Sequence, residues 1–335
     1  MIKFFPVAPE MELSGIKLVF LIHILLKKEY IYTMKTNIAI GHAAVFAAYL
    51  IFGLNIVICK DITASKLISP IGLFCIRSVG AGLLFWLISL FLPKEKVDIK
   101  DFPKIFMASL LGFFLTQMTF LMAISQITPM DCSIINSITP INTMIIAAIV
   151  LKEPITLKKA TGVLLSFCGI VYLITSSMQG NGTVATTSTQ GALLIVLNSI
   201  CFSLYLGIFK PVIAKYSVIT FMKWIFLFSM LMSLPFAGKE LAVLDYSSLP
   251  SQYLWKLSFL IICATFIAYF LIPLGQKHIR PTLVSMYSYV QPIIAIAISI
   301  YVGMDTLSAT KVLAAVTVFA GVVIVNSSRS AKEQK

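Results

Sequence analysis

Residues 123–174 read AISQITPMDCSIINSITPINTMIIAAIVLKEPITLKKATGVLLSFCGIVYLI and contain two long apolar runs separated by a short charged step. The runs cover about 130–151 and 158–176, and each is long enough to cross a hydrocarbon core about 30 Å thick as a helix. The first run carries Pro140 near its middle, and the second carries glycines. This stretch therefore predicts two consecutive membrane-spanning helices.

The same composition continues along the chain, which is 59% hydrophobic and only 12% charged. Soluble domains carry about 25% charged residues, so a soluble enzyme, a secreted disulfide scaffold and a disordered chain are excluded. Ten apolar runs have spanning length, at about 38–58, 71–92, 104–124, 130–151, 158–176, 191–213, 218–236, 256–274, 282–302 and 310–327. The predicted fold class is therefore an all-α integral membrane protein with ten transmembrane helices.

The basic residues predict the orientation of these helices. With the N-terminus inside, 17 Lys and Arg residues fall in cytoplasmic segments and 5 in outer loops. This bias is the usual determinant of topology, so both termini are expected to be cytoplasmic in a multi-pass protein of the inner or plasma membrane. The basic residues of the cytoplasmic segments account for the net charge of +13, so this charge does not indicate binding to nucleic acid. The expected partner is the lipid bilayer.

The second half repeats the first at an offset of 152 residues. The aligned pairs include Pro129 with Pro281, Ser133 with Ser285, Pro140 with Pro292, Glu153 with Asp305, Thr156 with Ser308, Lys159 with Lys311 and Gly169 with Gly321. Each half has an odd number of spans, so the copies are inverted in the membrane, as in many secondary transporters. The predicted divisions are an N-terminal extension (1–35), a first repeat (36–176), a polar outer linker (177–190), a second repeat (191–327) and a cytoplasmic tail (328–335). Residues 1–33 are expected to be dispensable, because Met34 could serve as the start of the chain.

Residues 123–174 resemble the signature end of an EamA domain of the drug/metabolite transporter superfamily. The matching features are the A-x-x-x-x-x-P opening at Ala123, the serine-rich helix with a central proline, the KEP step and the glycine-bearing last helix. Residues 275–326 resemble it too, although GMDTLS replaces LKEPIT. The resemblance covers about 36–327 and implies a ten-helix secondary carrier, often an exporter, of small metabolites or drug-like molecules. It implies no particular substrate.

An intramembrane lipid-modifying or hydrolytic enzyme and a channel are the alternatives. The three histidines are far apart, and the six cysteines form no CxxC pair. No catalytic, cofactor or metal site is therefore expected, and the inverted duplication favours a carrier over a channel.

Polar side chains inside the apolar runs are the candidate substrate-binding residues. They are Asn55, Arg77, Gln117, Ser133, Asn136, Ser137, Tyr205, Tyr269, Ser285, Tyr287, Tyr289 and Gln291. Each residue alone could form an interhelical hydrogen bond, whereas together they indicate a water-filled cavity. Gln117 and Tyr269 are equivalent at the 152-residue offset.

Two proline-containing helices are expected to form the walls of the substrate path. In the helix expected at 130–151, helical spacing places four residues on one face: Ser133, Ser137, Pro140 and Thr143. In the helix expected at 282–302, their equivalents share the corresponding face: Ser285, Tyr289, Pro292 and Ala295. A proline frees a carbonyl that needs a polar partner in lipid, so these prolines are predicted to be flexing points.

The remaining charged and small residues allow structural interpretations. Arg77 could attract an anionic substrate group or pair with Asp131, which is expected at a similar depth. Glu153 and Asp305 are interpreted as helix-start acids. Small residues spaced by seven predict close helix packing and leave open a homodimer through helices 5 and 10: Gly162, Gly169, Ala314 and Gly321.

Overall fold

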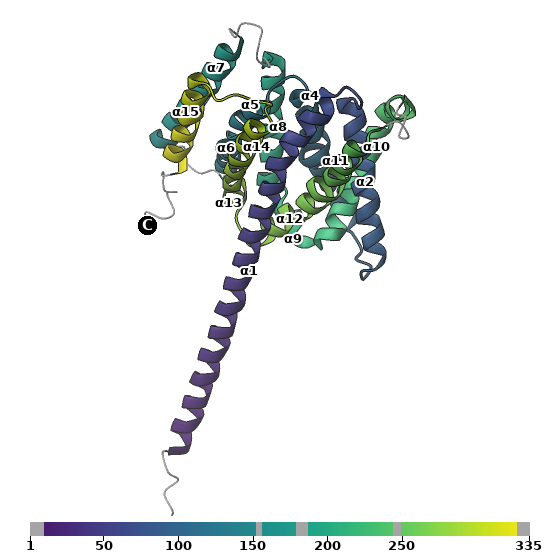
Figure 1. Ribbon diagram of the computed structural model, residues 1–335. Helices are drawn as coiled ribbons and strands as arrows, with labels where there is room; N and C mark the ends of the chain where they lie inside the picture. The colour runs from purple at the N-terminus through teal and green to yellow at the C-terminus, as the bar shows by residue number, and fades with distance from the viewer. Residues whose placement is uncertain (1–9, 152–155, 179–186, 244–248, 327–335) are drawn as a thin grey trace, which may run out of the picture.

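The computed structural model describes residues 10–151, 156–178, 187–243 and 249–326, and every regular element in this part of the chain is a helix (Figure 1). Eight of the described helices are long and apolar enough to cross a membrane, and two shorter apolar helices cover Ala160–Ser176 and Ala309–Ile324. The prediction of an all-α protein with ten spans is confirmed.

The first five spans are built from α-helices and two other helical segments. The first span lies in α1 (Glu10–Ala64) and the second is α2 (Pro70–Leu90). The third is formed by η1 (Ile99–Asp101), α3 (Phe102–Ser109), the π-helix η2 (Leu110–Leu115) and α4 (Thr116–Ile124). The fourth is formed by α5 (Pro129–Asn136) and α6 (Thr139–Leu151), and the fifth lies in α7 (Leu157–Met178).

The second five spans have the same plan. The sixth span is α8 (Thr189–Ile208), followed by the short α9 (Lys210–Lys215), and the seventh is α10 (Val218–Val243). The eighth is formed by α11 (Ser251–Phe259), the π-helix η3 (Leu260–Ile267) and α12 (Ala268–His278). The ninth is formed by α13 (Pro281–Met286), η4 (Tyr287–Tyr289) and α14 (Val290–Tyr301), and the tenth is α15 (Ala309–Asn326).

Helix α1 is much longer than the expected span at 38–58. It is continuous from Glu10 and extends far out of the bundle (Figure 1). No glycine or proline occurs between Gly15 and Gly41, so nothing in the backbone terminates the helix near Met34. The charged step at 27–29 does not break it.

Hydroxyl side chains start several of these helices. Ser69 Oγ accepts a hydrogen bond from the backbone N–H of Gly72, and Pro70 occupies the first position of α2. Thr128 does the same for α5 through the N–H of Asp131, again with a proline at the first position. A capping hydroxyl and a first-turn proline satisfy or remove amide donors that have no partner within the helix.

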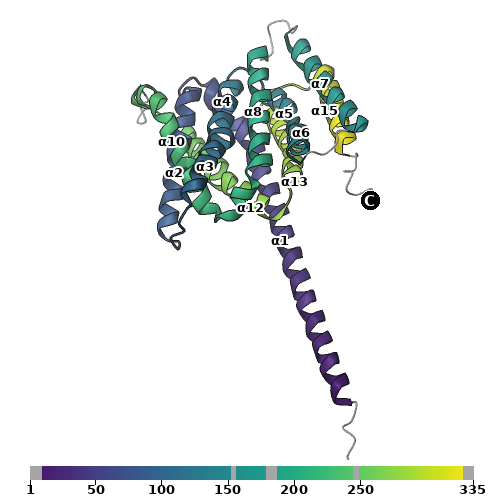
Figure 2. The ribbon, with the colours of Figure 1, turned by 180° about the vertical axis from the view of Figure 1, so that it is seen from behind.

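The two halves pack through equivalent pairs of helices. Helix α2 packs against its counterpart α10, and α7 packs against its counterpart α15. The other contacts are also equivalent. Helix α1 packs on α12 and α14, and its counterpart α8 packs on α4 and α6, which are the counterparts of α12 and α14. Figures 1 and 2 show the α7–α15 pair at one side of the bundle and the α2–α10 pair at the other. This exchange of equivalent contacts is expected of a pseudo-two-fold arrangement.

The small residues of the last helices make the α7–α15 contact within the chain. A Cβ added at Gly321 would lie 2.5 Å from the carbonyl oxygen of Gly162. Ser166 Oγ donates to the carbonyl oxygen of Val318 at 3.0 Å, and Ala314 is fully buried. The packing interpretation of these residues therefore holds within one chain, and their face is not available to a second copy.

Replacing Gly321 by valine is expected to destabilise the protein by about 1–3 kcal/mol, because the added carbons would push α15 away from the backbone of α7. Thermal unfolding of the purified protein measures this effect. The matched control is Ala320→Val, at an exposed position of the same helix. Equal unfolding temperatures for the two variants would contradict the close packing.

Candidate substrate site

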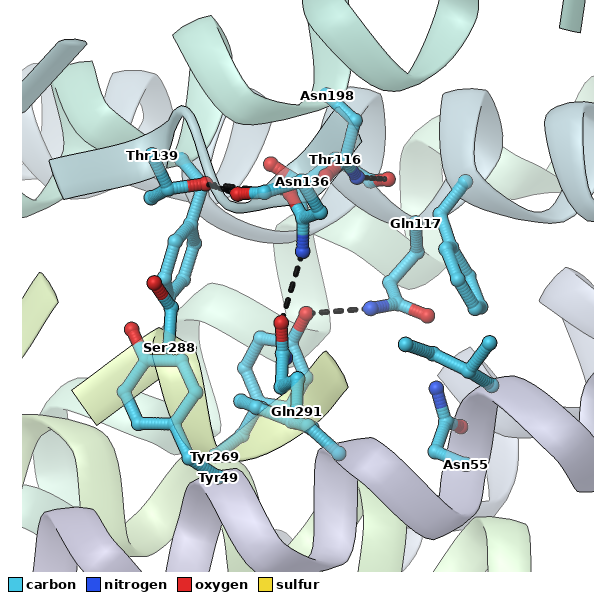
Figure 3. Close-up of a pocket in the computed structure, with 14 residues that line it drawn as sticks. Tyr49, Asn55, Thr116, Gln117, Asn136, Thr139, Asn198, Tyr269, Ser288 and Gln291 are labelled. Carbon is cyan, nitrogen blue, oxygen red and sulfur yellow. Dashed lines mark hydrogen bonds between the residues drawn. The ribbon is translucent and has the colours of Figure 1, made fainter. Parts of the chain in front are cut away.

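A cavity lies between the two halves of the bundle and encloses about 500 Å³ of empty space, its opening included. Helices α1, α4, α5 and α6 contribute from the first half, and α8, α12, η4 and α14 from the second. The lining residues are Tyr49, Phe52, Asn55, Ile56, Thr116, Gln117, Phe120, Asn136, Thr139, Asn198, Phe202, Tyr269, Ser288 and Gln291 (Figure 3). The lining is therefore uncharged, rich in carboxamides and hydroxyls, and partly aromatic.

Two equivalent helix breaks bring polar residues to this cavity. In the fourth span, α5 ends at Asn136 and α6 begins at Thr139, immediately before Pro140. In the ninth span, the short η4 interrupts the helix at the equivalent position before Pro292. Because Pro140 has no N–H, the carbonyl of Asn136 loses its helical partner, and Thr139 Oγ1 donates to it at 2.7 Å. A freed carbonyl with a polar partner is what the proline pattern predicted.

Two π-helical turns, η2 and η3, occupy equivalent places in the third and eighth spans. Thr116 Oγ1 donates to the carbonyl of Leu111 at 2.6 Å, and Thr265 Oγ1 donates to that of Leu260 at 2.7 Å. Each π-helix ends within two residues of a cavity residue, Gln117 in one half and Tyr269 in the other. Since a π-turn adds a residue and rotates the next part of the helix, it changes the direction in which these side chains point.

Hydrogen bonds across the cavity join the two halves. Gln117 Nε2 donates to the hydroxyl of its own counterpart Tyr269 at 2.6 Å, and Asn136 Nδ2 donates to Gln291 Oε1 at 2.9 Å (Figure 3). Asn198 Nδ2 donates to the carbonyl oxygen of Thr116 at 2.5 Å. A contact between two equivalent residues places the cavity on the pseudo-two-fold axis.

Three polar atoms of the lining are buried and have no hydrogen-bond partner among the described residues: Tyr49 OH, Gln117 Oε1 and Ser288 Oγ. Leaving such an atom unpaired costs about 1–3 kcal/mol. Together these groups can both donate and accept, because two are hydroxyls and one is a carbonyl. The cavity is thus suited to a polar molecule that supplies both kinds of partner.

Five of the twelve sequence-predicted residues come together around the cavity: Asn55, Gln117, Asn136, Tyr269 and Gln291. The serines lie outside the lining, and their hydroxyls donate to backbone carbonyls of their own spans: Ser133 to Met130, Ser137 to Ser133, and Ser285 to Thr282. The tyrosines outside the lining contact aromatic rings: Tyr205 stacks on Phe202, Tyr287 lies near His42, and Tyr289 meets the edge of Phe319. The proline-containing helices do line the cavity, but through residues adjacent to the expected faces.

Arg77 lies behind the cavity wall and does not pair with Asp131. Its Nε donates to Thr265 Oγ1 at 2.9 Å and its Nη1 to Cys59 Sγ at 3.5 Å. The interpretation of Arg77 as the structural partner of Asp131 is therefore wrong. Similar depth predicted that the two residues could meet, whereas Arg77 bonds to Thr265 of η3 and Asp131 lies beside Lys311 of α15.

Asp131 instead belongs to a buried cluster with Asp305 and Lys311, called here the α15 cluster. Lys311 Nζ lies 2.5 Å from Asp305 Oδ1 and 3.5 Å from Asp131 Oδ1. Asp305 also accepts the backbone N–H of Met130, and Thr187 donates to Asp131. Asp305 thus does more than occupy a helix start, because it ties α15 to α5. Glu153 lies outside the described residues.

Sequence reasoning missed nine residues of the lining: Tyr49, Phe52, Ile56, Thr116, Phe120, Thr139, Asn198, Phe202 and Ser288. Asn198 was detectable as a carboxamide within an apolar run, and Ser288 as the counterpart of Asn136. The aromatic residues carried no signal, since such side chains occur throughout a membrane bundle.

A ten-span bundle of two inverted repeats around a polar cavity on their common axis defines a membrane transporter. Residues 39–175 and 189–327 both match the EamA-like transporter family. The chain therefore belongs to that family, whose members are transporters and not enzymes.

Three curated relatives have similar sequences, each 26% identical over the matched region. An uncharacterized transporter of Archaeoglobus fulgidus matches over 155 residues, which is 46% of this chain and 52% of the relative. The uncharacterized transporters YyaM and YetK of Bacillus subtilis match over 64% and 68% of this chain, and over 69% and 68% of their own lengths. The chain thus spans about half of the archaeal relative and about two thirds of the bacterial ones.

A solved crystal structure shares the fold. It superposes with a TM-score of 0.56 at 16% sequence identity, covering 85% of this chain and 95% of the other.

Proposed function

We propose that this protein is a secondary transporter that exports a small metabolite or drug-like molecule across the cytoplasmic membrane by alternating access. The observation that carries this proposal is the cavity on the pseudo-two-fold axis, where both repeats contribute equivalent residues. An inverted pair of repeats has two related conformations, open to opposite sides, which are reached when one repeat rocks against the other.

The paired helix breaks and π-turns are suited to be the moving points. Both occur at equivalent places in the two repeats, next to Asn136 and Ser288 and next to Gln117 and Tyr269. A change of conformation in one repeat can therefore be mirrored in the other. Backbone irregularities of this kind absorb torsion changes that a regular helix resists.

The substrate is expected to replace bonds that now cross the cavity. Asn55, Gln117, Asn136, Tyr269 and Gln291 would contact it, because their amide and hydroxyl groups face the empty space. Bonds such as Asn136–Gln291 would be exchanged for bonds to the substrate at little net cost, since each group keeps a partner.

The membrane orientation and a homodimer are also proposals. The bias of 17 basic residues against 5 supports cytoplasmic termini.

The outer faces of α7 and α15 expose apolar side chains, including Leu164 and Val323. A homodimer through helices 5 and 10 would use these faces, which otherwise contact lipid.

Metabolite release identifies the substrate and tests transport. We expect cells that produce the protein to release at least one small molecule faster than cells without it, and purified protein in liposomes to move that compound down its gradient. Saturable movement without chemical change supports a carrier. Accumulation of a reaction product, or single-channel currents from purified protein, would contradict it.

A protein that begins at Met34 is expected to insert and transport like the full chain. All cavity residues come after position 48, and Lys35 retains a basic residue before the first span. Membrane insertion and release of the identified compound measure the effect. Loss of either in the shortened protein would assign residues 1–33 a necessary role.

A further inference from the structure

Arg77 is a fully buried cation for which the described residues provide no carboxylate. It is 1% exposed, and its Nη2 has no hydrogen-bond partner in the described part of the chain. All ion pairs among the described residues are formed by lysines, and none includes Arg77. Because a buried charge without a counter-charge is costly, an opposite charge from outside the chain would stabilise this site.

Hydrogen bonds link Arg77 to the cavity wall through Cys59. Cys59, which accepts a hydrogen bond from Arg77, donates in turn to Asn55 Oδ1 at 3.4 Å, and Asn55 lines the cavity. On the other side, Arg77 binds Thr265, one helical turn before the cavity residue Tyr269. The charge of Arg77 acts on the cavity through the protein interior, where the effective dielectric constant is lower than in water, so its interaction is screened less.

The cavity itself contains no charge that would compete with Arg77. None of its fourteen lining residues is Asp, Glu, Lys, Arg or His. Its carboxamides and hydroxyls suit polar groups, and Phe52, Phe120 and Phe202 offer apolar surface. The site therefore combines a positive potential from behind one wall with neutral polar and aromatic walls elsewhere.

We propose that the substrate is an organic anion of the carboxylate type with an apolar ring or chain, and that Arg77 balances its negative charge through the wall formed by Asn55 and Tyr269. This inference rests on the proposed function, since it takes the cavity to be the substrate site. It excludes cations as the preferred class of substrate.

Three probes of nearly identical shape test the charge preference: benzoate, benzamide and benzamidinium, measured at pH 7 by equilibrium binding to the purified full-length protein. They differ in charge at one end of the same ring. We expect benzoate to bind at least about tenfold more tightly than benzamide, and benzamidinium to bind most weakly. Equal binding of the three probes, tighter binding of benzamidinium, or binding of none would overturn the inference.

Variants at Arg77 identify the source of the preference. Arg77→Gln is expected to lower the affinity for benzoate to that for benzamide, whereas Arg77→Lys, which keeps the charge, retains the preference. The control is Lys223→Gln, which removes a cation that lies over the Trp86 ring and should leave the preference unchanged. If Arg77→Gln does not fold, the order of the probes on the unmodified protein and on Arg77→Lys decides. A preference that persists in folded Arg77→Gln would contradict a role for Arg77.

The inference and the proposed function fail in different ways. Transport of a neutral or cationic compound through the cavity would overturn the charge class and leave the transporter in place. Tight binding of benzoate without transport of any released compound would overturn the proposed function alone.

Discussion

Lys311→Met is expected to lower the free energy of unfolding by about 3–5 kcal/mol, because it leaves two buried carboxylates of the α15 cluster without their shared cation. Asp131 and Asp305 are 1% and 0% exposed at their side chains, so water cannot replace the ammonium group. Thermal or denaturant-induced unfolding of the purified protein in detergent measures the loss.

Lys256→Met is the matched control, because Lys256 forms an equally short ion pair with Asp61 that is partly open to solvent. This loss should be about 0–1 kcal/mol, as for exposed ion pairs. Changing Asp131 and Asp305 to asparagine in the Lys311→Met protein should restore part of the stability, since it removes the uncompensated charges. Equal losses at Lys311 and Lys256 would show that the α15 cluster contributes no more than a surface pair.

Ser288→Trp is expected to reduce transport to the rate of protein-free liposomes while leaving the fold intact. Ser288 lines the cavity at the break before Pro292, so an indole there would occupy the space that the substrate needs. Uptake of the compound identified by metabolite release measures the effect, and the elution profile and unfolding temperature report the fold.

Ile293→Trp is the control for this prediction, because Ile293 lies in the same span but is 67% exposed on the outer surface. Transport by this variant should match that of the unmodified protein. Asn136→Trp, which blocks the cavity from the first repeat, should behave like Ser288→Trp. Normal transport by folded Ser288→Trp would place the substrate path elsewhere.

The number, order and approximate limits of the spans could be predicted from the sequence because lipid requires long apolar helices. The internal repeat also predicted that Gln117 and Tyr269 are equivalent, and the structure shows them in contact. The extent of α1 could not be predicted from hydropathy, because a helix continues past a polar boundary unless its backbone is interrupted.

The face of each proline-containing helix was predicted with an error of a few positions. Helical spacing extrapolated from Ser133 to Thr143 assumes a regular helix, whereas α5 ends at Asn136 and α6 begins at Thr139. Asn136 and Thr139, the residues on either side of this break, line the cavity, and Ser133 does not. The π-turns have no sequence signature, and depth in the membrane does not determine which helices touch, as Arg77 and Asp131 illustrate.

The accessibility of single cysteines tests most directly whether this cavity is the substrate path. Cysteines at 136 and 288 in a cysteine-free protein should react with a membrane-impermeant thiol reagent, and the transported compound should slow both reactions. Cysteines at 133 and 285, three positions earlier in the same spans, are fully buried outside the cavity lining and should stay unreactive. Faster labelling at 133 and 285 than at 136 and 288, or no protection by the compound at either cavity position, would contradict the account.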